Sequence, residues 1–328
     1  MKIAVVGLGA VGGLLAARLS RSGNTVSALA RGATLDAVRT RGLHLVMEGE
    51  ETCATVVASD RASELGPQDL VIVALKGPAL AAAAADMQPL FGASTVVMPA
   101  MNGMPWWFLH AAPEVGPFAD RTLASVDPGG RIAERLPLDR VIGCVVHLTC
   151  SSPAPGVVCH GFGDRLIVGE PRGGLSTRVA GVRDALGAAG FTSEASPDIR
   201  KDIWYKLWGN MTMNPVSALT GAESHRILDD PLVLGFILRA MEEAAVIGAR
   251  IGCTIDQSGE ERMAVARQLG AFRTSMLQDL LAERPLEIDA LVGAVHEIGT
   301  RLSMPLPNIG ALLGLTRLMA RERGLYPA

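Results

Sequence analysis

Three glycines near the start of the chain have the spacing of a phosphate-binding turn. The apolar, β-prone run Lys2–Val6 precedes them, and a run with helical apolar periodicity follows over Gly13–Leu19. Gly7 would permit a tight turn, Gly9 would let the backbone approach a pyrophosphate, and Gly12 would let the helix lie close to the strand. The N–H groups and dipole at the helix N-terminus would then face the anion. The loop Gly7-Leu8-Gly9-Ala10-Val11-Gly12 therefore predicts a dinucleotide site.

Two basic residues stand where the next strands end. The predicted second strand, Thr25–Ala30, is followed by Arg31, where enzymes that prefer NAD usually carry an acid that binds the ribose 2′-hydroxyl. Arg31 can instead pair with a 2′-phosphate, which favours NADP; an ordinary solvated loop cation is the alternative interpretation. Lys76 ends the buried strand Asp69–Leu75 at the carboxyl edge of the sheet, where a bound cofactor must pass. We predict that Lys76 contacts the cofactor.

A cation and two amides share one face of a predicted helix in the second half of the chain. Lys206, Asn210 and Asn214 are spaced by four residues, which aligns them along one stripe. The neighbouring residues are apolar, so the stripe is half-buried, and buried amides need hydrogen-bond partners. The stripe is therefore a candidate functional face, whereas a lone lysine is usually a solvated cation. Pro215 is expected to kink or stop the helix directly after Asn214.

Two further polar residues have a structural and a functional interpretation. Ser275 is placed to cap the N-terminus of a helix, with Gln278 at the capping-box position. Glu287 precedes a long apolar helix, in whose first turn a carboxylate would interact favourably with the helix dipole. The spacing alone leaves both interpretations open.

Strand and helix signals alternate along the first half of the chain, as in a doubly wound parallel sheet. After about Ser196 the strand signals vanish and helical periodicity continues to the end. We predict an α/β domain over 1–195 and an all-helical domain over 196–328, with a ligand cleft between them at the carboxyl ends of the strands. The stretch 113–137 is expected to be a long surface excursion inside the first domain.

The remaining predicted elements follow the same two patterns. The predicted strands are Leu43–Met47, Thr55–Ala58, Ser94–Met98, Asp139–Leu148, Gly156–His160, Arg165–Val168 and Phe191–Glu194. The predicted helices are Thr34–Arg41, Ala79–Met87, Leu175–Ala189, Pro197–Met213, Leu232–Ile251, Gln257–Leu269, Ser275–Leu281, Ile288–Leu302 and Asn308–Arg323.

The composition excludes several classes of protein. The 30 basic and 33 acidic residues give a net charge of −3, so nothing electrostatic favours a nucleic acid or a membrane surface as a partner. No apolar run reaches the ~18–20 residues of a membrane span. The five cysteines lack C-x-x-C spacing, so we expect reduced, mostly buried thiols in a cytoplasmic protein and no metal site.

Taken together, these residues resemble the ketopantoate reductase (2-dehydropantoate 2-reductase) family over nearly the whole chain. The matching elements are the Gly7–Gly12 loop, Arg31, Lys76, Asn102-Gly103, Lys206 with Asn210 and Asn214-Pro215, Ser275–Asp279 and Glu287–Asp289. The resemblance implies a Rossmann-type NADP-binding domain, a helical substrate-binding domain and NADPH-dependent reduction of a 2-oxo acid. It also implies that Lys206 is the general acid and that Glu287 holds the substrate hydroxyl. Asn102 would lie near the nicotinamide and the lysine, and Asn210, Asn214 and Ser275 would line the substrate pocket.

Three departures from the family pattern concern the substrate. Phe272 and Val292 stand where family members that act on ketopantoate usually carry asparagines, and Trp106-Trp107 follow the asparagine loop. The first hypothesis is an NADPH-dependent reductase that converts ketopantoate to pantoate. The alternative is an NADPH-dependent reductase of another 2-oxo acid or of a bulkier carbonyl compound. A cofactor-binding sensor without turnover and a dehydrogenase working in the oxidative direction are further alternatives. The tryptophans could also simply pack the excursion against the sheet. The Met- and Leu-rich C-terminal helices are compatible with a homodimer.

Overall fold

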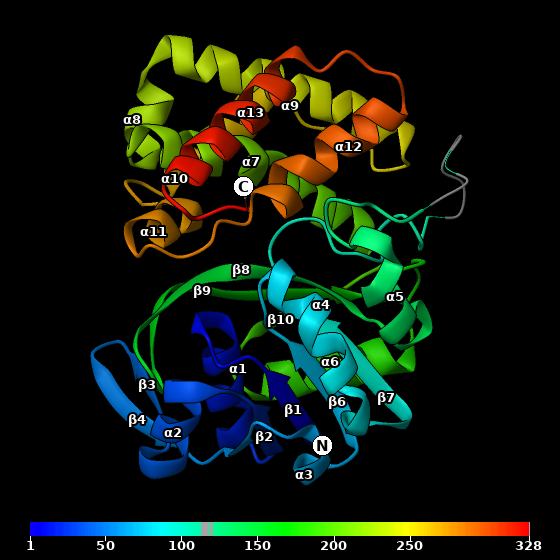
Figure 1. The fold of residues 1–328 in the computed structure, drawn as a ribbon, viewed down its shortest axis with the longest axis vertical. Coiled ribbons are helices and arrows are strands. Elements are labelled where there is room, and N and C mark those ends of the chain that lie inside the picture. The colour runs from blue at the N-terminus through cyan, green and yellow to red at the C-terminus, as the bar shows by residue number, and fades with distance from the viewer. Residues whose placement is uncertain (113–117, 119–120, 328) are drawn as a thin grey trace. The chain divides into compact units, whose positions relative to one another are not determined.

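The computed structural model describes residues 1–112, 118 and 121–327, with Pro78 described by its backbone alone. The described chain divides into two compact units (Figure 1): 1–101 with 130–202, and 102–129 with 203–328. Prediction had divided the chain between 195 and 196 and had put 113–137 in the first domain. The structure groups 102–129 with the second unit, where Phe108 buries its ring between those of Trp107 and Trp204. Residues 113–117 and 119–120 of the excursion lie outside the described residues.

The first unit contains the predicted parallel sheet. Its strand order is β5-β2-β1-β6-β7, and every pairing is parallel. Crossing helices cover such a sheet, so residues 3–6 and 70–73 of its inner strands are all apolar and buried. The strands are β1 Lys2–Val6, β2 Thr25–Leu29, β5 Val57–Ser59, β6 Gln68–Val73 and β7 Phe91–Pro99. The expected doubly wound class is confirmed.

A second sheet in the same unit was not predicted. β9 (Val157–Gly169) pairs in parallel with β3 (Leu43–Met47) and β10 (Thr192–Ser196), and antiparallel with β8 (Gly143–Ala154). β4 (Glu50–Ala54) forms a hairpin with β3, and no strand was predicted there. β9 joins two predicted strands. Its register with β8 shifts near Gly161 and Gly163, and Gly163 adopts φ of +76°, as in a β-bulge.

Helix α1 (Ala10–Arg21) packs against both sheets. A Cβ on Gly13 would come within 2.4 Å of Val158 Cγ2 on β9, so glycine lets the helix approach the second sheet. The other helical segments of this unit are α2 Gly32–Arg41, α3 Ala62–Leu65, α4 Gly77–Asp86, η1 Gln88–Leu90, α5 Arg131–Arg135, η3 Leu138–Arg140 and α6 Thr177–Ala188, with η2 Pro128–Gly130 where the two units meet in the sequence. One apolar core joins both sheets through α1.

The second unit is helical, as predicted. Its helices are α7 Ile199–Thr220 (which begins in the first unit), α8 Ser224–Asp229, α9 Pro231–Arg250, α10 Gly259–Gln268, α11 Ser275–Leu281, the π-helical segment η4 Asp289–Gly293, α12 Ala294–Arg301 and α13 Pro307–Glu322. The short α8 was not predicted, and the predicted helix Ile288–Leu302 opens with the π-helical turn. None of the helices described has the length and apolar character that a membrane span requires.

Pro215 was expected to kink or stop its helix; it does not stop the helix, because α7 continues to Thr220, and the kink stays a prediction. Proline lacks the N–H that would bond to the carbonyl of Met211 and crowds that carbonyl. The helix is retained because its C-terminal half is buried: Met211, Val216 and Ser217 are each at most 5% exposed. Packing of this face outweighs the local cost of the proline.

Candidate active site

The glycine loop joins β1 to α1 with the geometry that the spacing predicts. Gly7 has φ of +92°, and a Cβ there would lie 2.6 Å from Leu75 Cδ2. A Cβ on Gly12 would lie 1.9 Å from the carbonyl oxygen of Gly7, so only glycine lets the helix begin this close to the strand.

Gly9 shows that the loop fits a dinucleotide. It is the exposed N-cap residue of α1, and a Cβ there would meet nothing within 4 Å. The space beside the loop is therefore open next to a helix N-terminus, where backbone N–H groups attract anions. Of the other loop residues, Leu8 is buried, and Val11 is partly buried and packs on the core of the unit. Leu8 and Val11 therefore anchor the turn in the core.

Arg31 has a partner that sequence reasoning missed. Its guanidinium makes a 2.5 Å ion pair with Asp86 at the end of α4, and the two side chains are 64% and 52% exposed. Nothing in the sequence pattern links positions 31 and 86, which the sheet brings together. An exposed pair of this kind contributes about 1 kcal/mol or less, so a phosphate can compete for the guanidinium. Lys76 is the partly buried N-cap residue of α4, and its predicted contact with the cofactor stays a prediction.

The second unit brings Lys206 and Asn102 together. The Lys206 ammonium donates a 2.7 Å hydrogen bond to Asn102 Oδ1 across 104 residues of sequence. Gly103 holds the asparagine turn in place: its φ is +82°, and a Cβ there would lie 2.7 Å from the carbonyl oxygen of Ala290. The same carbonyl accepts a 2.7 Å hydrogen bond from the Met104 N–H. The asparagine loop is thus fixed to the segment that follows Glu287.

The stripe on α7 continues from Lys206 to a second contact. Asn214 is 5% exposed, and its Nδ2 donates a 3.3 Å hydrogen bond to Ser275 Oγ. Asn210 lies between Lys206 and Asn214 on the same face and is partly buried. The structure thus brings Ser275 to the predicted polar face of α7.

Ser275 is not the cap of α11. The N-cap residue is Thr274, whose hydroxyl accepts a 3.3 Å hydrogen bond from the Leu277 N–H. Gln278 donates its amide to the carbonyl of Arg273, so the expected capping box is absent. Sequence spacing missed this because Thr and Ser are both good caps and differ here by one position. The hydroxyl of Ser275 is exposed and bonds only to Asn214 among the contacts described.

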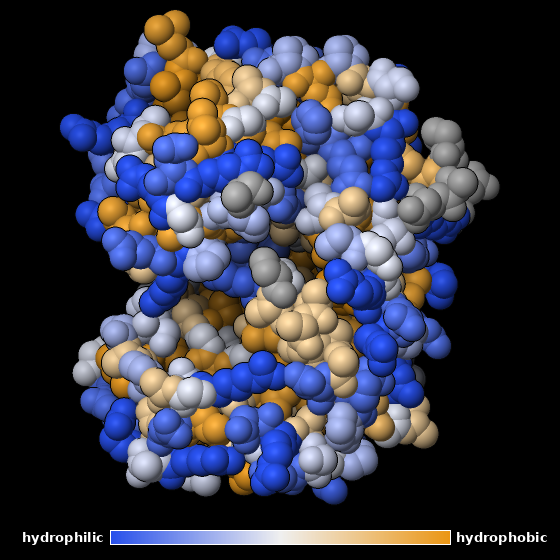
Figure 2. All heavy atoms as spheres, viewed as in Figure 1, coloured by the Kyte–Doolittle hydropathy of each residue, from blue (hydrophilic) through white to orange (hydrophobic). Residues whose placement is uncertain are grey.

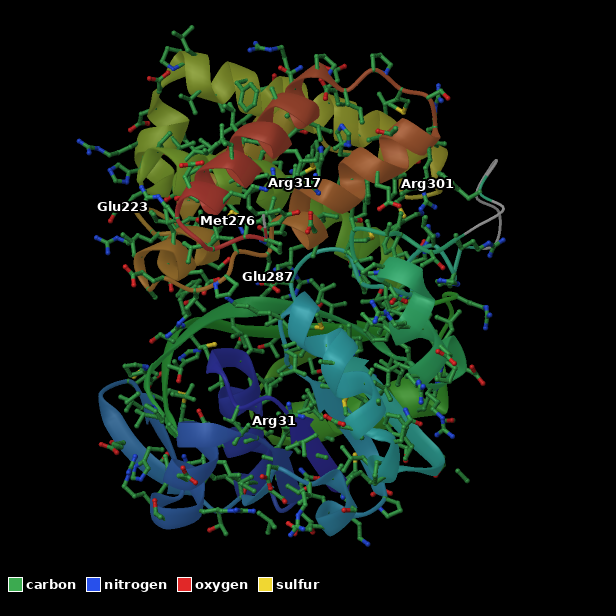
Figure 3. The ribbon with its side chains drawn as sticks, viewed as in Figure 1. Arg31, Glu223, Met276, Glu287, Arg301 and Arg317 are labelled. Atoms are coloured by element: carbon green, nitrogen blue, oxygen red, sulfur yellow. The ribbon has the colours of Figure 1, made fainter. Side chains whose placement is uncertain are left out.

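Glu287 lies directly before the helical turn that begins at Ile288, and it is partly exposed (Figure 3). The π-helical segment η4 follows it, and such turns are frequent at functional sites. The Leu286 N–H bonds to the carbonyl of Leu325, and Asp289 accepts hydrogen bonds from Arg317 and Tyr326. The segment carrying Glu287 is therefore anchored on both sides.

The aromatic residues after the asparagine loop belong to the core. Trp106 and Trp107 are 3% and 1% exposed, and the ring of Phe108 lies 6.2 Å from that of Trp204 on α7. Phe108 thus packs against α7 within the second unit, and Trp107 packs beside Phe108. Val292 is also fully buried, whereas Phe272 is partly exposed. Of the departures that put the substrate in question, only Phe272 retains exposed surface.

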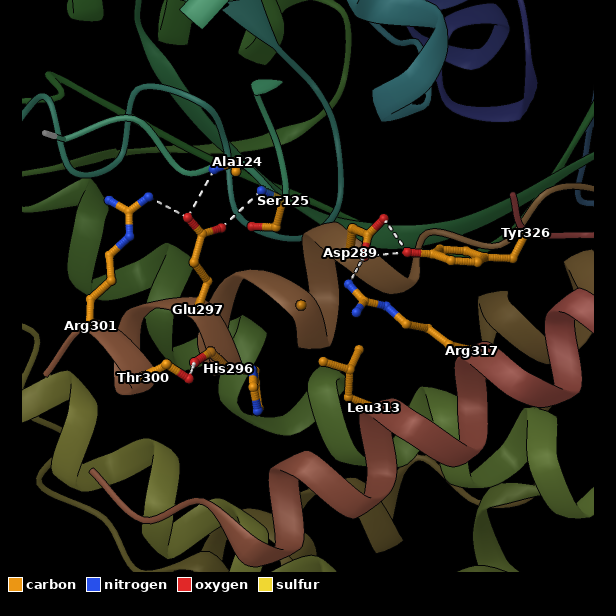
Figure 4. A pocket seen from close by; sticks show the side chains of 11 residues that line it. Ala124, Ser125, Asp289, His296, Glu297, Thr300, Arg301, Leu313, Arg317 and Tyr326 are labelled. Atoms are coloured by element: carbon orange, nitrogen blue, oxygen red, sulfur yellow. Dashed lines mark hydrogen bonds and ion pairs between the residues drawn. The ribbon is translucent and has the colours of Figure 1, made fainter. Parts of the chain in front are cut away.

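A cavity of about 530 Å³ lies elsewhere in the second unit (Figure 4). It contains none of the predicted site residues; its walls are Ala124, Ser125, Asp289, Gly293, His296, Glu297, Thr300, Arg301, Leu313, Arg317 and Tyr326. Glu297 accepts hydrogen bonds from the backbone N–H groups of Ala124 and Ser125, at 2.9 and 2.8 Å. Burial acts to raise the pKa of Glu297, but these bonds and the Arg301 charge outweigh it and hold that pKa below its usual range.

No group of three or more His, Cys, Asp or Glu side chains in the described ranges could hold a metal ion. Burial raises the pKa of the Cys150 thiol to about 12, which makes it a poor nucleophile and metal ligand. Cys144 and Cys253 are buried as expected, whereas Cys53 is exposed.

Comparison with known proteins agrees with this geometry. The family model described as Ketopantoate reductase PanE/ApbA matches residues 3–114, and Ketopantoate reductase PanE/ApbA C terminal matches 198–320. A 2-dehydropantoate 2-reductase of Mesorhizobium japonicum is 44% identical over 327 residues, covering 99% of this chain and all of the relative. The chain belongs to the ketopantoate reductase family. It is an oxidoreductase with a Rossmann-type N-terminal domain and a helical C-terminal domain, and a family model matches each of them.

Solved structures place the fold in the same family. A crystal structure from Ralstonia solanacearum MolK2, provisionally named a ketopantoate reductase, is 56% identical with a TM-score of 0.94 and covers 99% of both chains. D-Mandelate dehydrogenase, in a complex with NADH and anilino(oxo)acetate, has a TM-score of 0.84 at 21% identity over 99% of this chain and 100% of that one. At that identity the likeness concerns the fold alone.

The separate positions of Thr274 and Ser275 give a direct test. Thr274→Ala removes the cap of α11 and should lower the free energy of unfolding by about 1 kcal/mol, measured by urea denaturation. Ser275→Ala removes an exposed hydroxyl and should change it by less than about 0.5 kcal/mol. Equal losses in the two variants would contradict the assignment of Thr274 as the cap.

Proposed function

We propose that this chain catalyses the NADPH-dependent reduction of 2-dehydropantoate (ketopantoate) to pantoate, the reductive step that its relatives are named for. The observation that carries the proposal is the hydrogen bond between Lys206 and Asn102, beside the segment that bears Glu287. A ketone that accepts a hydride becomes an alkoxide, which needs a cation and a proton at the same place. A positioned ammonium supplies both.

A bound nicotinamide dinucleotide would supply the hydride. The glycine loop and Lys76 would hold its phosphates, Arg31 its 2′-phosphate, and Asn102 would lie by the nicotinamide. This chain's own residues handle the proton. The Asn102 amide oxygen orients the Lys206 ammonium, which donates a proton to the developing alkoxide oxygen and so forms the new O–H bond. The hydride from a bound nicotinamide would form the C–H bond. The deprotonated lysine then recovers a proton from solvent.

The remaining polar groups bind the substrate. Asn210, Asn214 and Ser275 form a line of amides and a hydroxyl that can pair with a carboxylate and a carbonyl. Glu287 would accept a hydrogen bond from the substrate hydroxyl. A carboxylate at this point accepts a hydrogen bond from a hydroxyl and would repel a second carboxylate on the substrate. It therefore favours a small hydroxy acid over a dicarboxylic acid.

The preference for NADPH is proposed from Arg31, although Asp86 modifies the argument. The carboxylate pairs with the guanidinium and would be displaced by a 2′-phosphate. The electrostatic gain from binding NADPH is therefore reduced by the loss of that pair. Asp86 also sets a negative charge near the 2′-phosphate, so its removal should strengthen the preference.

A different 2-oxo acid or a bulkier carbonyl is the second candidate, and Phe272 is the observation that favours it. Its backbone N–H and carbonyl both bond to Ser224 at 3.0 Å, which fixes the residue three positions before Ser275. An apolar ring at that position cannot pair with a substrate hydroxyl. The tryptophans no longer support this candidate, since they are buried.

Cytoplasmic location and a homodimer are also proposed. The cytoplasmic assignment rests on the free cysteines. Leu315 and Leu318 on α13 are 57% and 56% exposed, and Figure 2 shows apolar surface among polar residues on the helical unit. Such side chains on one helix face favour contact with a second copy.

Lys206→Ala should lower kcat for ketopantoate by ~10²-fold or more, because the positioned proton donor is lost. NADPH affinity, measured by fluorescence titration, should stay within about threefold. Lys201→Ala is the matched control: this lysine is on the same helix, is exposed and pairs with Asp198. Near-normal turnover in the Lys206 variant would assign the proton to another group.

NADPH should be used at least about tenfold more efficiently than NADH, which corresponds to ~1.4 kcal/mol or more. Arg31→Ala should remove most of this preference and spare NADH use, and Asp86→Asn should increase it. Both are measured as kcat/KM with each cofactor. Arg39→Ala removes a nearby exposed cation and serves as control. Equal efficiency of the unmodified protein with both cofactors would refute the assignment.

Ketopantoate should be preferred over its deoxy analogue, 2-oxo-3,3-dimethylbutanoate, when both are compared by kcat/KM with NADPH. An unpaired buried carboxylate or hydroxyl costs ~1–3 kcal/mol, so the preference can reach about a hundredfold. Preference for the deoxy compound, reversed by Phe272→Asn, would instead support the second candidate.

A further inference from the structure

The segment that bears Glu287 is held by the C-terminal part of the chain. The Leu286 N–H donates a 3.2 Å hydrogen bond to the carbonyl of Leu325. The Tyr326 hydroxyl lies 2.9 Å from both carboxylate oxygens of Asp289. Glu287 is thus flanked by two contacts, one directly before it and one two residues after it, to adjacent residues of the tail.

Arg317 completes the group. Its Nη2 donates a 2.5 Å hydrogen bond to Asp289 Oδ1, and its guanidinium lies 5.6 Å from the centre of the Tyr326 ring (Figure 4). Arg321 lies 5.4 Å from the same ring and donates to the carbonyl of Pro327. Two cations and a hydrogen-bonded hydroxyl therefore fix the orientation of Tyr326.

Local geometry makes room for this arrangement. Gly324 has φ of +67°, which lets the chain turn back after α13, and the Leu325 N–H then bonds to the carbonyl of Ala320 at 2.8 Å. A Cβ on Gly293 would lie 2.9 Å from Asp289 Oδ1 and 3.3 Å from Arg317 Nη2. Glycine at 293 thus leaves the ion pair the space it needs within the π-helical segment.

The opposite end of the segment is held differently. Ala290 bonds to Met104 in the loop that carries Asn102, and Asn102 accepts the hydrogen bond from Lys206. Leu286 and Asp289, the two residues that the tail holds, precede Ala290 in the sequence. Loss of the Tyr326 contact should therefore displace Glu287 and leave the Lys206–Asn102 pair in place.

We propose that Tyr326 and Arg317 are positioning residues that act through Asp289 to set Glu287 for the substrate hydroxyl. The inference rests on the proposed function, in which Glu287 contacts that hydroxyl. A displacement of ~1 Å at a substrate-positioning group can cost up to about a hundredfold in rate, so a lost hydroxyl contact has a measurable effect. The effect is confined to substrates that present the hydroxyl.

The test compares ketopantoate with 2-oxo-3,3-dimethylbutanoate in Tyr326→Phe, which removes one hydroxyl and keeps the ring. The kcat/KM for ketopantoate should fall about tenfold, while that for the deoxy analogue should change less than about twofold. Tyr205→Phe is the matched control, because Tyr205 has the same kinds of contact. Its hydroxyl donates a hydrogen bond to Gln257, and the Arg262 guanidinium lies 5.2 Å from the centre of its ring. This control should leave the ratio of the two efficiencies unchanged.

A double-mutant cycle distinguishes positioning of Glu287 from a purely structural role of Tyr326. In a Glu287→Ala background, Tyr326→Phe should lower ketopantoate efficiency by less than about twofold, since the group it positions is gone. If Tyr326→Phe does not fold, Asp289→Asn replaces it; this variant keeps an acceptor for the tyrosine and loses the charge that pairs with Arg317. It should shift the substrate ratio in the same direction.

The outcomes separate the two proposals. A parallel fall with both substrates, an unchanged ratio, or full additivity with Glu287→Ala overturns the positioning role alone. An unmodified protein that shows no preference for ketopantoate overturns the proposed function and this inference with it.

Discussion

The hydrogen bond between the Lys206 ammonium and Asn102 Oδ1 is the contact on which the candidate site depends. It joins two positions 104 residues apart and gives the lysine a fixed direction. A flexible lysine has three rotatable donors and no preferred orientation, so it becomes an effective acid only when a partner holds it. The asparagine loop, the π-helical segment and α7 all contribute to that one geometry.

The residues that hold this contact in place take no part in the proposed reaction. Gly103 permits the turn at Asn102, and the backbone of Ala290 accepts the Met104 N–H. The buried rings of Trp107, Phe108 and Trp204 hold the rest of the excursion against α7. These aromatic residues act as a packed core that fixes the loop, and this role explains their burial without a role in substrate recognition.

The first unit depends on a different constraint, which is steric. Gly7 and Gly12 stand where any side chain would collide with backbone, and at Gly9 the space is open. Close helix–strand packing and an exposed helix N-terminus are the two features that anion sites of this kind require. A second sheet, packed on the other side of α1, makes that helix part of the core, so the loop is held by the whole unit.

The sequence alone determined the glycine turn, the parallel sheet, the helical second half and the stripe of Lys206, Asn210 and Asn214. These follow from local spacing and periodicity, which act over a few residues. Even the family resemblance rested on such short motifs. They carried the prediction of the general acid and of most of the proposed ligand residues.

Which of these residues meet follows from the tertiary structure. Asp86 beside Arg31 and a proline tolerated inside α7 each depend on packing or on contacts between distant segments. The Trp106-Trp107 pair shows the same limit, because burial is set by the final fold. The C-terminal contacts to Leu286 and Asp289 lie some 40 residues from Glu287, further than any local spacing reaches. Local pattern fixes element type, and long-range packing fixes which side chains share a site.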